Sequence, residues 1–195
     1  MKPPVSAVLL AAGLSERMGT TKQLLPLKDK PVITHCIDTI MSSGVSDLVV
    51  VLGLNGELIE ETISRLPVNI TFNNDPLSDM SESIRTGLHG IDHASTGVLI
   101  CLSDHPLVSP DTIRTLMEWY IKEPDKIVLP SYKGHRGHPV LFPRQVAEEI
   151  FQWVTLKQIV RKDDQRIRQC EVPDEGILLD MDTAEDYKEI LKRLS

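Results

Sequence analysis

The stretch Ser6–Leu27, SAVLLAAGLSERMGTTKQLLPL, decides how the rest of the chain is interpreted. It opens with an apolar run of strand character, changes to a loop with two glycines, and becomes apolar again. The loop also carries Arg17 and Lys22. Glycine lets backbone N–H groups approach an anion closely, and the two cations add positive charge. The loop therefore favours a phosphorylated ligand behind the first strand.

Two familiar phosphate-binding motifs do not fit this loop. A dinucleotide fingerprint has the pattern G-x-G-x-x-G, whereas five residues separate Gly13 from Gly19. A P-loop places Lys and then Ser or Thr directly after its second glycine, whereas Lys22 lies three residues beyond Gly19 and precedes Gln23. On these local features alone, a turn with incidental surface charge is as good an interpretation as a phosphate site.

Beyond this loop, apolar runs of strand character alternate with helical patterns. We expect strands at Ala7–Leu10, Asp47–Leu52, Val68–Phe72, Val98–Leu102, Ile127–Leu129, His138–Phe142, Arg168–Val172 and Ile177–Leu179. We expect helices over Pro31–Ser43, Gly56–Arg65, Ser81–Asp92, Pro110–Lys122, Pro143–Trp153 and Thr183–Leu194. Because the strands are continuously apolar, the pattern predicts a mostly parallel sheet with helices on both faces, an α/β three-layer sandwich of Rossmann-like type. Residues 1–195 contain no internal repeat or linker-like stretch, so we expect a single domain.

Local chemistry supports several helix starts. Ser109 is expected to cap the helix at Pro110, Ser81 the helix at residue 81, and Asp182 the last helix. Ligands of parallel sheets bind at the carboxyl ends of strands, so we expect the ligand-binding loops to be those after the first strand, the fourth strand and the later pair of strands.

Composition restricts the class of protein. The net charge of −7 argues against general nucleic-acid binding, although the first 35 residues carry five lysines and arginines against two acids. This local excess of positive charge suits a small anionic ligand. No apolar run reaches the length of a membrane helix, and three scattered cysteines suit a reducing cytoplasm. We therefore expect a cytoplasmic protein that binds neither nucleic acid nor membranes.

The whole string LAAG-x-S-x-RMG-x-x-K-x-LLPL resembles the signature loop of the MobA-like nucleotidyltransferases. Four further motifs of that family follow in order, namely SDMSESIRTGL, LSDHPLVSPDTI, GHRGHPVLF and LLDMDTAEDY. They resemble most closely the branch that contains molybdenum cofactor cytidylyltransferase. The resemblance covers essentially the whole chain and implies the nucleotide-diphospho-sugar transferase type of fold.

The resemblance also implies roles for individual residues. Its nucleotide-binding residues would be Leu10, Ala11, Ala12, Gly13, Arg17, Lys22 and Ser81, within an N-terminal nucleotide-binding part. Its catalytic residues would be Arg17, Lys22 and Asp104, and Asp104 and Asp182 would bind Mg²⁺. The region of about residues 130–182 would face the acceptor, which Arg136 and His138 would contact.

The residues themselves leave alternatives open at the aspartates and histidines. Asp104 follows the apolar strand at Val98–Leu102, which suits a magnesium ligand, but an Asp at this place also caps turns. Asp180 and Asp182 are two residues apart and could face one cation, or Asp182 could serve only as a helix cap. His135 and His138 form an H-x-x-H pattern without cysteine partners, which is weak evidence for zinc.

The reaction that the resemblance implies is transfer of CMP from CTP to the terminal phosphate of a molybdopterin-type cofactor, with Mg²⁺ as cofactor and pyrophosphate as product. A molybdenum hydroxylase would be a transient partner. One alternative is a nucleotidyltransferase with a sugar- or polyol-phosphate acceptor. Another is a molybdenum-cofactor carrier without catalytic activity.

Overall fold

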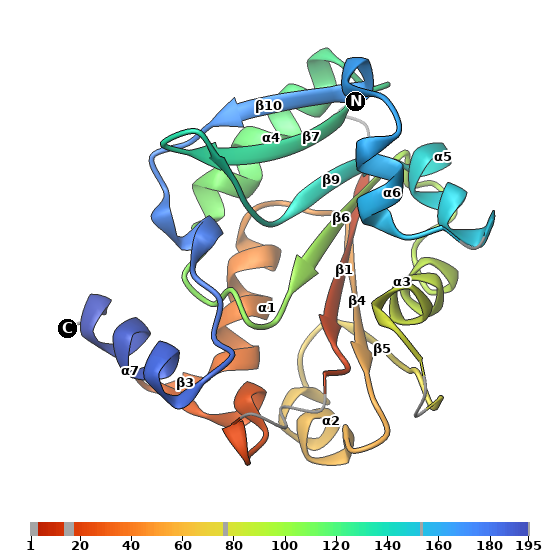
Figure 1. Cartoon of the computed structure of the whole chain (residues 1–195). Coiled ribbons are helices and arrows are strands. Elements are labelled where there is room, and N and C mark those ends of the chain that lie inside the picture. Colours follow the sequence, from red (N-terminus) through yellow and green to blue (C-terminus); the bar gives the residue numbers. More distant parts are fainter. Residues whose placement is uncertain (1–3, 14–17, 76–77, 153, 195) are drawn as a thin grey trace.

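The computed structural model describes residues 4–13, 18–75, 78–152 and 154–194, so Arg17 and Trp153 lie outside the described residues. Figure 1 shows a central sheet with helices packed on both of its faces. Within the described residues, no helix is long and apolar enough to cross a membrane.

The central sheet is mixed but mostly parallel. Its strand order is β10–β7–β9–β6–β1–β4–β5, and the short strand β8 pairs with β7 outside this path. The strands are β1 (Val5–Ala11), β4 (Asp47–Leu52), β5 (Asn69–Phe72), β6 (Gly97–Leu102), β7 (Ile127–Tyr132), β8 (His135–Arg136), β9 (Val140–Pro143) and β10 (Ile167–Glu171). Strand β1 is parallel to both of its neighbours, β4 and β6, whereas β9 is antiparallel to β6 and to β7.

The two faces of the sheet form separate apolar cores because successive side chains of β1 point to opposite faces. Ala7 and Leu9 pack in one core with side chains of α1 (Val32–Ser42), α2 (Glu57–Ile63), α4 (Pro110–Lys122) and α7 (Ala184–Arg193). Val8 and Leu10 pack in the other core with side chains of α3 (Met80–His89) and of the segment 146–160. All seven residues of β1 are buried. The expected three-layer α/β architecture is confirmed.

The chain path defines a switch point next to β1. From β1 the chain proceeds outward through β4 to the edge strand β5, and then α3 returns it to β6 on the other side of β1. The connections after β1 and β6 therefore lead away in opposite directions from the same edge of the sheet. In open α/β sheets this is the place where ligands bind.

Two segments differ from the expected secondary structure. The expected strand Ile177–Leu179 is instead part of η5, a 3-10 helix over Glu175–Leu178, where the Asp174 side chain accepts a hydrogen bond from Gly176 N. The expected helix from Pro143 is divided into α5 (Arg144–Ala147) and η3, a 3-10 helix over Glu148–Gln152. Short apolar runs fit several periodicities, so capping and packing decide between them.

Short elements outside the main pattern were not expected. A hairpin of β2 (Pro26–Leu27) and β3 (Lys30–Pro31) precedes α1, and η2 (Lys22–Leu24) precedes the hairpin. Helix α6 (Leu156–Arg161) follows η3 and carries a capping box, and η4 (Asp164–Arg166) leads into β10.

Two of the three expected helix caps are wrong. Ser109 does cap α4, because its side chain accepts a hydrogen bond from Thr112 N. The cap of α3 is Asp79 rather than Ser81, and its carboxylate accepts from Glu82 N. The cap of α7 is Thr183 rather than Asp182. In both wrong cases another residue within two positions caps the helix instead. Because Thr183 caps α7, the side chain of Asp182 is left for another role.

Candidate active site

A cleft of about 550 Å³ lies at the carboxyl ends of the parallel strands. This volume is in the range of small-molecule sites. Five segments line it: Leu10, Ala12, Gly13, Lys22 and Gln23 from the end of β1 and the part of the chain that leads to η2; Gly53 and Leu54 after β4; Asn73, Asp75, Ser78, Asp79, Met80 and Ser83 from the end of β5 into α3; Leu102, Ser103 and Asp104 at the end of β6; and Asp182 before α7. The cleft thus coincides with the switch point of the sheet.

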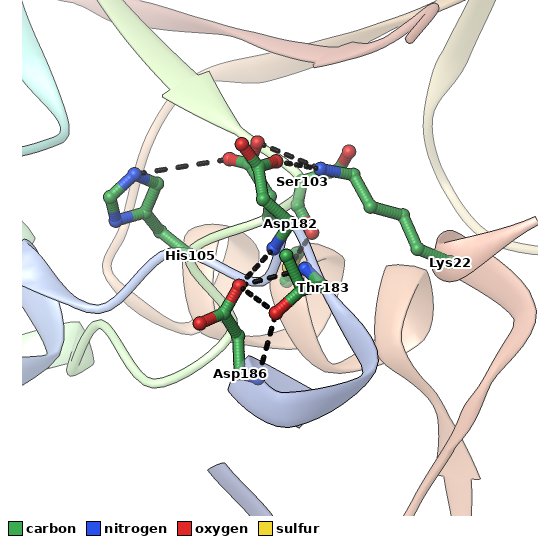
Figure 2. A network of polar contacts seen from close by, with 8 residues as sticks. Lys22, Ser103, His105, Asp182, Thr183 and Asp186 are labelled. Carbon is green, nitrogen blue, oxygen red and sulfur yellow. Dashed lines mark hydrogen bonds and ion pairs between the residues drawn. The ribbon is translucent and has the colours of Figure 1, made fainter. Parts of the chain in front are cut away.

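The most charged part of the cleft is a cation between two carboxylates. The Nζ atom of Lys22 lies 3.0 Å from Asp104 Oδ2 and 2.9 Å from Asp182 Oδ1. The Lys22 side chain is 9% exposed, and those of Asp104 and Asp182 are 24% and 28% exposed. In Figure 2 the Lys22 side chain extends across the site to reach Asp182. Three segments far apart in sequence therefore meet at one ammonium group.

The charge of Lys22 follows from this environment. Burial by itself lowers the pKa of a lysine, because it disfavours the charged form. The charges and hydrogen bonds of Asp104 and Asp182 outweigh that effect, so the pKa of Lys22 is raised above its ordinary value. Lys22 is therefore protonated at neutral pH, and its ammonium bridges the two carboxylates.

The segment that carries Asp182 is fixed on both sides of this residue. Before it, Met181 is fully buried, and its N–H donates to the backbone carbonyl of Asp104 at 2.9 Å. After it, Thr183 and Asp186 form the capping box of α7, and Asp186 Oδ2 also accepts from Asp182 N at 3.1 Å. Figure 2 shows Thr183 and Asp186 next to Asp182. The Asp182 side chain is thereby directed to the site rather than into a helix cap.

The second carboxylate oxygen of Asp104 has a different environment. Asp104 Oδ1 is buried and, within the described residues, accepts no hydrogen bond. Nε2 of His105 lies 3.8 Å from it, and the ring of His105 lies 5.2 Å from the ring of His138. A buried acceptor without a donor is costly unless a ligand satisfies it.

Three of the residues predicted at the end of β1 lie at the cleft. Leu10, Ala12 and Gly13 line the cleft, while Ala11 is buried at the end of β1. Gly19 adopts a φ of +63°, which glycine accepts readily. The expected catalytic and nucleotide-binding residue Arg17 lies outside the described residues.

The structure places the other predicted residues at varying distances from the cleft. Ser81 is buried and does not line the cleft, whereas Ser83 does and accepts a hydrogen bond from Asn73 Nδ2 at 2.9 Å. Arg136 lies exposed on β8, and its Nε donates to Gln169 Oε1 at 2.9 Å. His138 lines a separate small cavity with His105 and two cysteines.

That small cavity does not look like a second reactive centre. It is lined mainly by apolar side chains, and its volume of about 20 Å³ is close to that of one water position. Burial raises the pKa of Cys36 to about 12 and also raises the pKa of Cys101, so both side chains remain thiols. Burial is the main cause that lowers the pKa of His138 to about 4, and the nearby ring of His105 lowers it further. The imidazole of His138 is therefore neutral at pH 7.

Two residues of the cleft were missed by the sequence analysis. A Cβ atom added to Gly53 would lie 2.7 Å from the backbone oxygen of Ala12, so only glycine lets the loops after β1 and β4 approach each other. Asn73 is buried and joins the loop before α3 through hydrogen bonds to Ser78 Oγ and Ser83 Oγ. Gly53 follows β4, the neighbour of β1, and Asn73 follows β5, the next parallel strand. Their position directly after parallel strands was the signal that could have identified them.

The residues at the cleft fit a magnesium ion bound with a polyphosphate. Two carboxylates, Asp104 and Asp182, present oxygens to the same nitrogen atom, and Asp104 Oδ1 is an unsatisfied buried acceptor. The described part of the chain contains no cluster of three or more His, Cys, Asp or Glu side chains suited to a metal. One or two carboxylates together with phosphate oxygens and waters are the usual ligands of Mg²⁺.

Comparison with known proteins identifies relatives of the chain. The model of the MobA-like NTP transferase domain matches residues 7–170. Molybdenum cofactor cytidylyltransferase of Escherichia coli strain K12 is 25% identical over 94% of this chain and 93% of its own. A probable molybdenum cofactor guanylyltransferase of Natranaerobius thermophilus is 31% identical over 69% of this chain and 64% of its own. Nicotine blue oxidoreductase of Paenarthrobacter nicotinovorans is 26% identical over 97% of both chains.

Solved structures are similar over nearly the whole chain. Rv0371c from Mycobacterium tuberculosis H37Rv has a TM-score of 0.87 and 28% identity, covering 98% of this chain and 99% of that one. A complex of the same protein with manganese has a TM-score of 0.84 and 26% identity, covering 98% and 100%.

Proposed function

The chain belongs to the MobA-like NTP transferase family, and from this premise we propose that it transfers CMP from CTP to the terminal phosphate of a molybdopterin-type cofactor. The observation that carries the proposal is the ammonium of Lys22 between Asp104 and Asp182, in a cleft of suitable volume for a nucleotide. A triphosphate requires cations for its oxygens, and a divalent ion requires carboxylates beside them. The cleft supplies both.

The proposed reaction is a single displacement. An oxygen of the acceptor phosphate forms a bond to the α-phosphorus of CTP. The bond from the α-phosphorus to the oxygen that bridges to the β-phosphorus breaks, and its electron pair leaves with pyrophosphate. A phosphate monoester is already anionic near neutral pH, so the acceptor requires no general base from the protein.

The residues of the cleft then act by positioning and by charge. Backbone groups of Ala12 and Gly13 would lie against the nucleotide, and Lys22 would bind its phosphate oxygens. Arg17 is assigned the same task from the family pattern. Asp104 and Asp182 would hold Mg²⁺, which when bound neutralises negative charge on the phosphates. Such catalysis needs no covalent intermediate on the protein.

The choice of nucleotide and acceptor rests on likeness to relatives. Relatives named for cytidylyl and for guanylyl transfer to molybdenum cofactor both match this chain. We assign CTP because Ala12 stands where the guanylyltransferase branch tends to have a second glycine. We assign the acceptor to the region of about residues 130–182, where Arg136 is exposed and could bind an anion. A molybdenum hydroxylase would receive the product.

The alternatives make different predictions for one assay. Purified protein is incubated with each of the four nucleoside triphosphates, Mg²⁺ and either molybdopterin-type cofactor or sugar and polyol phosphates, and pyrophosphate release is measured. We expect release with CTP and the molybdenum cofactor alone. Release only with a sugar or polyol phosphate would favour that acceptor. Cofactor binding without any pyrophosphate release would favour a carrier and would contradict the proposed transfer.

A further inference from the structure

Lys22 is hydrogen-bonded to one oxygen of each carboxylate that would hold a divalent ion. Its Nζ atom lies 3.0 Å from Asp104 Oδ2 and 2.9 Å from Asp182 Oδ1, which are hydrogen-bond distances to both. The side chain is almost completely buried, so its ammonium is held close to both carboxylates. An internal cation thus stands beside both carboxylates.

An internal cation of this kind opposes a divalent ion in two ways. It uses the carboxylate oxygens as hydrogen-bond acceptors, and its positive charge repels a second cation at short range. The metal and the ammonium therefore compete for the same anionic oxygens. The free protein should bind a divalent ion only weakly by itself, although it has suitable ligands.

A polyphosphate changes this competition because it offers Lys22 other oxygens of high negative charge. Charge-assisted hydrogen bonds to phosphate are strong, so the ammonium has a partner to replace each carboxylate that it leaves. We propose that Lys22 acts as an internal counter-ion that prevents Asp104 and Asp182 from binding a divalent ion until a nucleoside triphosphate draws its ammonium away. The inference rests on the proposed function, because it requires triphosphate binding in this cleft.

The position of Lys22 in the fold supports an exchange of partners rather than a permanent ion pair. Lys22 begins η2, and its backbone carbonyl accepts from Leu25 N, so the backbone of this residue is held. The long side chain reaches from there to carboxylates on two other segments, 82 and 160 residues further along the chain. Its ammonium can move within the cleft while the backbone remains in place. Binding of metal and triphosphate is then mutually favourable, as linkage requires.

The test measures Mn²⁺ binding by electron paramagnetic resonance, without turnover. Wild-type protein, Lys22→Met and the control Lys30→Met are titrated with Mn²⁺ alone. Lys30 is a suitable control because it pairs with Asp38 at 2.7 Å on the surface, outside the cleft. We expect Lys22→Met to bind Mn²⁺ at least about tenfold more tightly than wild type, since a tenfold change needs only a small difference in free energy. Lys30→Met should match wild type.

A second set of titrations adds Mn²⁺ to each protein together with a non-hydrolysable CTP analogue. Mn²⁺ added to the analogue without protein is the reference, because the analogue itself binds the ion. Wild type should gain Mn²⁺ affinity with the analogue, and Lys22→Met should gain much less. The double variant Lys22→Met with Asp104→Asn should lose the tight Mn²⁺ site. If Lys22→Met does not fold, Lys22→Gln replaces it, and the rise in melting temperature with Mn²⁺ gives an independent measure of affinity.

The outcomes separate this inference from the proposed function. Equal affinity of wild type and Lys22→Met for Mn²⁺ alone overturns the inference, and the proposed function survives if wild type still gains affinity with the analogue. No gain in wild type with the analogue of any of the four nucleoside triphosphates overturns both, because no triphosphate then draws Lys22 away.

Discussion

The backbone N–H of Met181 donates a 2.9 Å hydrogen bond to the backbone carbonyl of Asp104. This bond joins the segment before α7 to the loop after β6, and the adjacent side chains of Asp104 and Asp182 converge on Lys22. Backbone pairing thus places two carboxylates from distant parts of the chain on the same side of the cleft. The arrangement is held by backbone contacts of the fold, which is the preorganisation that phosphoryl transfer requires.

Asp104→Asn should reduce turnover far more than it reduces stability. The substitution keeps the shape of the side chain but removes the charge that would hold a divalent ion, so we expect turnover to fall by about 100-fold or more. Pyrophosphate release at saturating CTP and Mg²⁺ measures the loss. Turnover within a few-fold of wild type, in a protein of normal circular dichroism, would contradict the role of Asp104.

Thr183→Val should weaken α7 and the placement of Asp182. The Thr183 side chain accepts from Asp186 N, and the substitution removes this cap while preserving shape. Loss of such a cap costs about 1 kcal/mol, or about 2–4 °C in melting temperature for a chain of this size. The Thr155→Val variant at the start of α6 is a matched control, since it removes an equivalent capping box away from the cleft. Only Thr183→Val should also weaken Mn²⁺ binding in the presence of CTP.

Gly53→Ala should weaken nucleotide binding. The added methyl group would lie 2.7 Å from the backbone oxygen of Ala12, so the loops after β1 and β4 must separate. We expect the KM for CTP to rise by about tenfold, equivalent to about 1.4 kcal/mol. Gly87→Ala is the contrasting variant, because its methyl group would clash with the Val8 side chain within the core. It should lower the melting temperature without this change in KM, and equal KM values for Gly53→Ala and wild type would refute the steric argument.

His138 should make the protein less stable in mild acid. Burial and His105 lower the folded-state pKa of His138 to about 4, against 6.5 for an unperturbed histidine. Its contribution is therefore fully present above pH 6.5 and is lost as the pH falls toward 4, because the unfolded chain takes up the proton first. The loss amounts to roughly 3 kcal/mol when the pH falls through the whole interval.

Denaturant unfolding at several pH values between 7 and 4.5 measures this effect. The stability of His138→Gln should fall less steeply with decreasing pH than that of wild type. The exposed residue His93 provides the control, and His93→Gln should follow the wild-type curve. Parallel curves for wild type and His138→Gln would contradict the assignment.

The sequence was sufficient to predict the architecture because its long strands have an unambiguous apolar pattern. The strand Asp47–Leu52 and the helix Pro110–Lys122 have the bounds that were expected. Prediction failed where short apolar runs had to be assigned, as at Ile177, and where two adjacent residues could both cap a helix, as at Asp182 and Thr183. Such choices depend on tertiary contacts that local patterns do not contain.

The site was predictable to the extent that a family motif carries it. The motif brought Lys22, Asp104 and Asp182 to attention, and the structure places all three in contact. Contact between Lys22 and both carboxylates could not be predicted, because it depends on how three distant loops meet. The role of Gly53 was hidden for the same reason, since its close contact with Ala12 exists only in the folded chain.

The central claim is that one cleft binds the triphosphate and the divalent ion together, between the loop after β1 and the two aspartates. A crystal structure with Mn²⁺ and a non-hydrolysable CTP analogue tests it most directly, because the anomalous signal of manganese locates the ion. We predict an ion bonded to Asp104 and Asp182, with the phosphates against Gly13 and Lys22. A nucleotide bound elsewhere, or a manganese ion that neither aspartate contacts, would contradict the account.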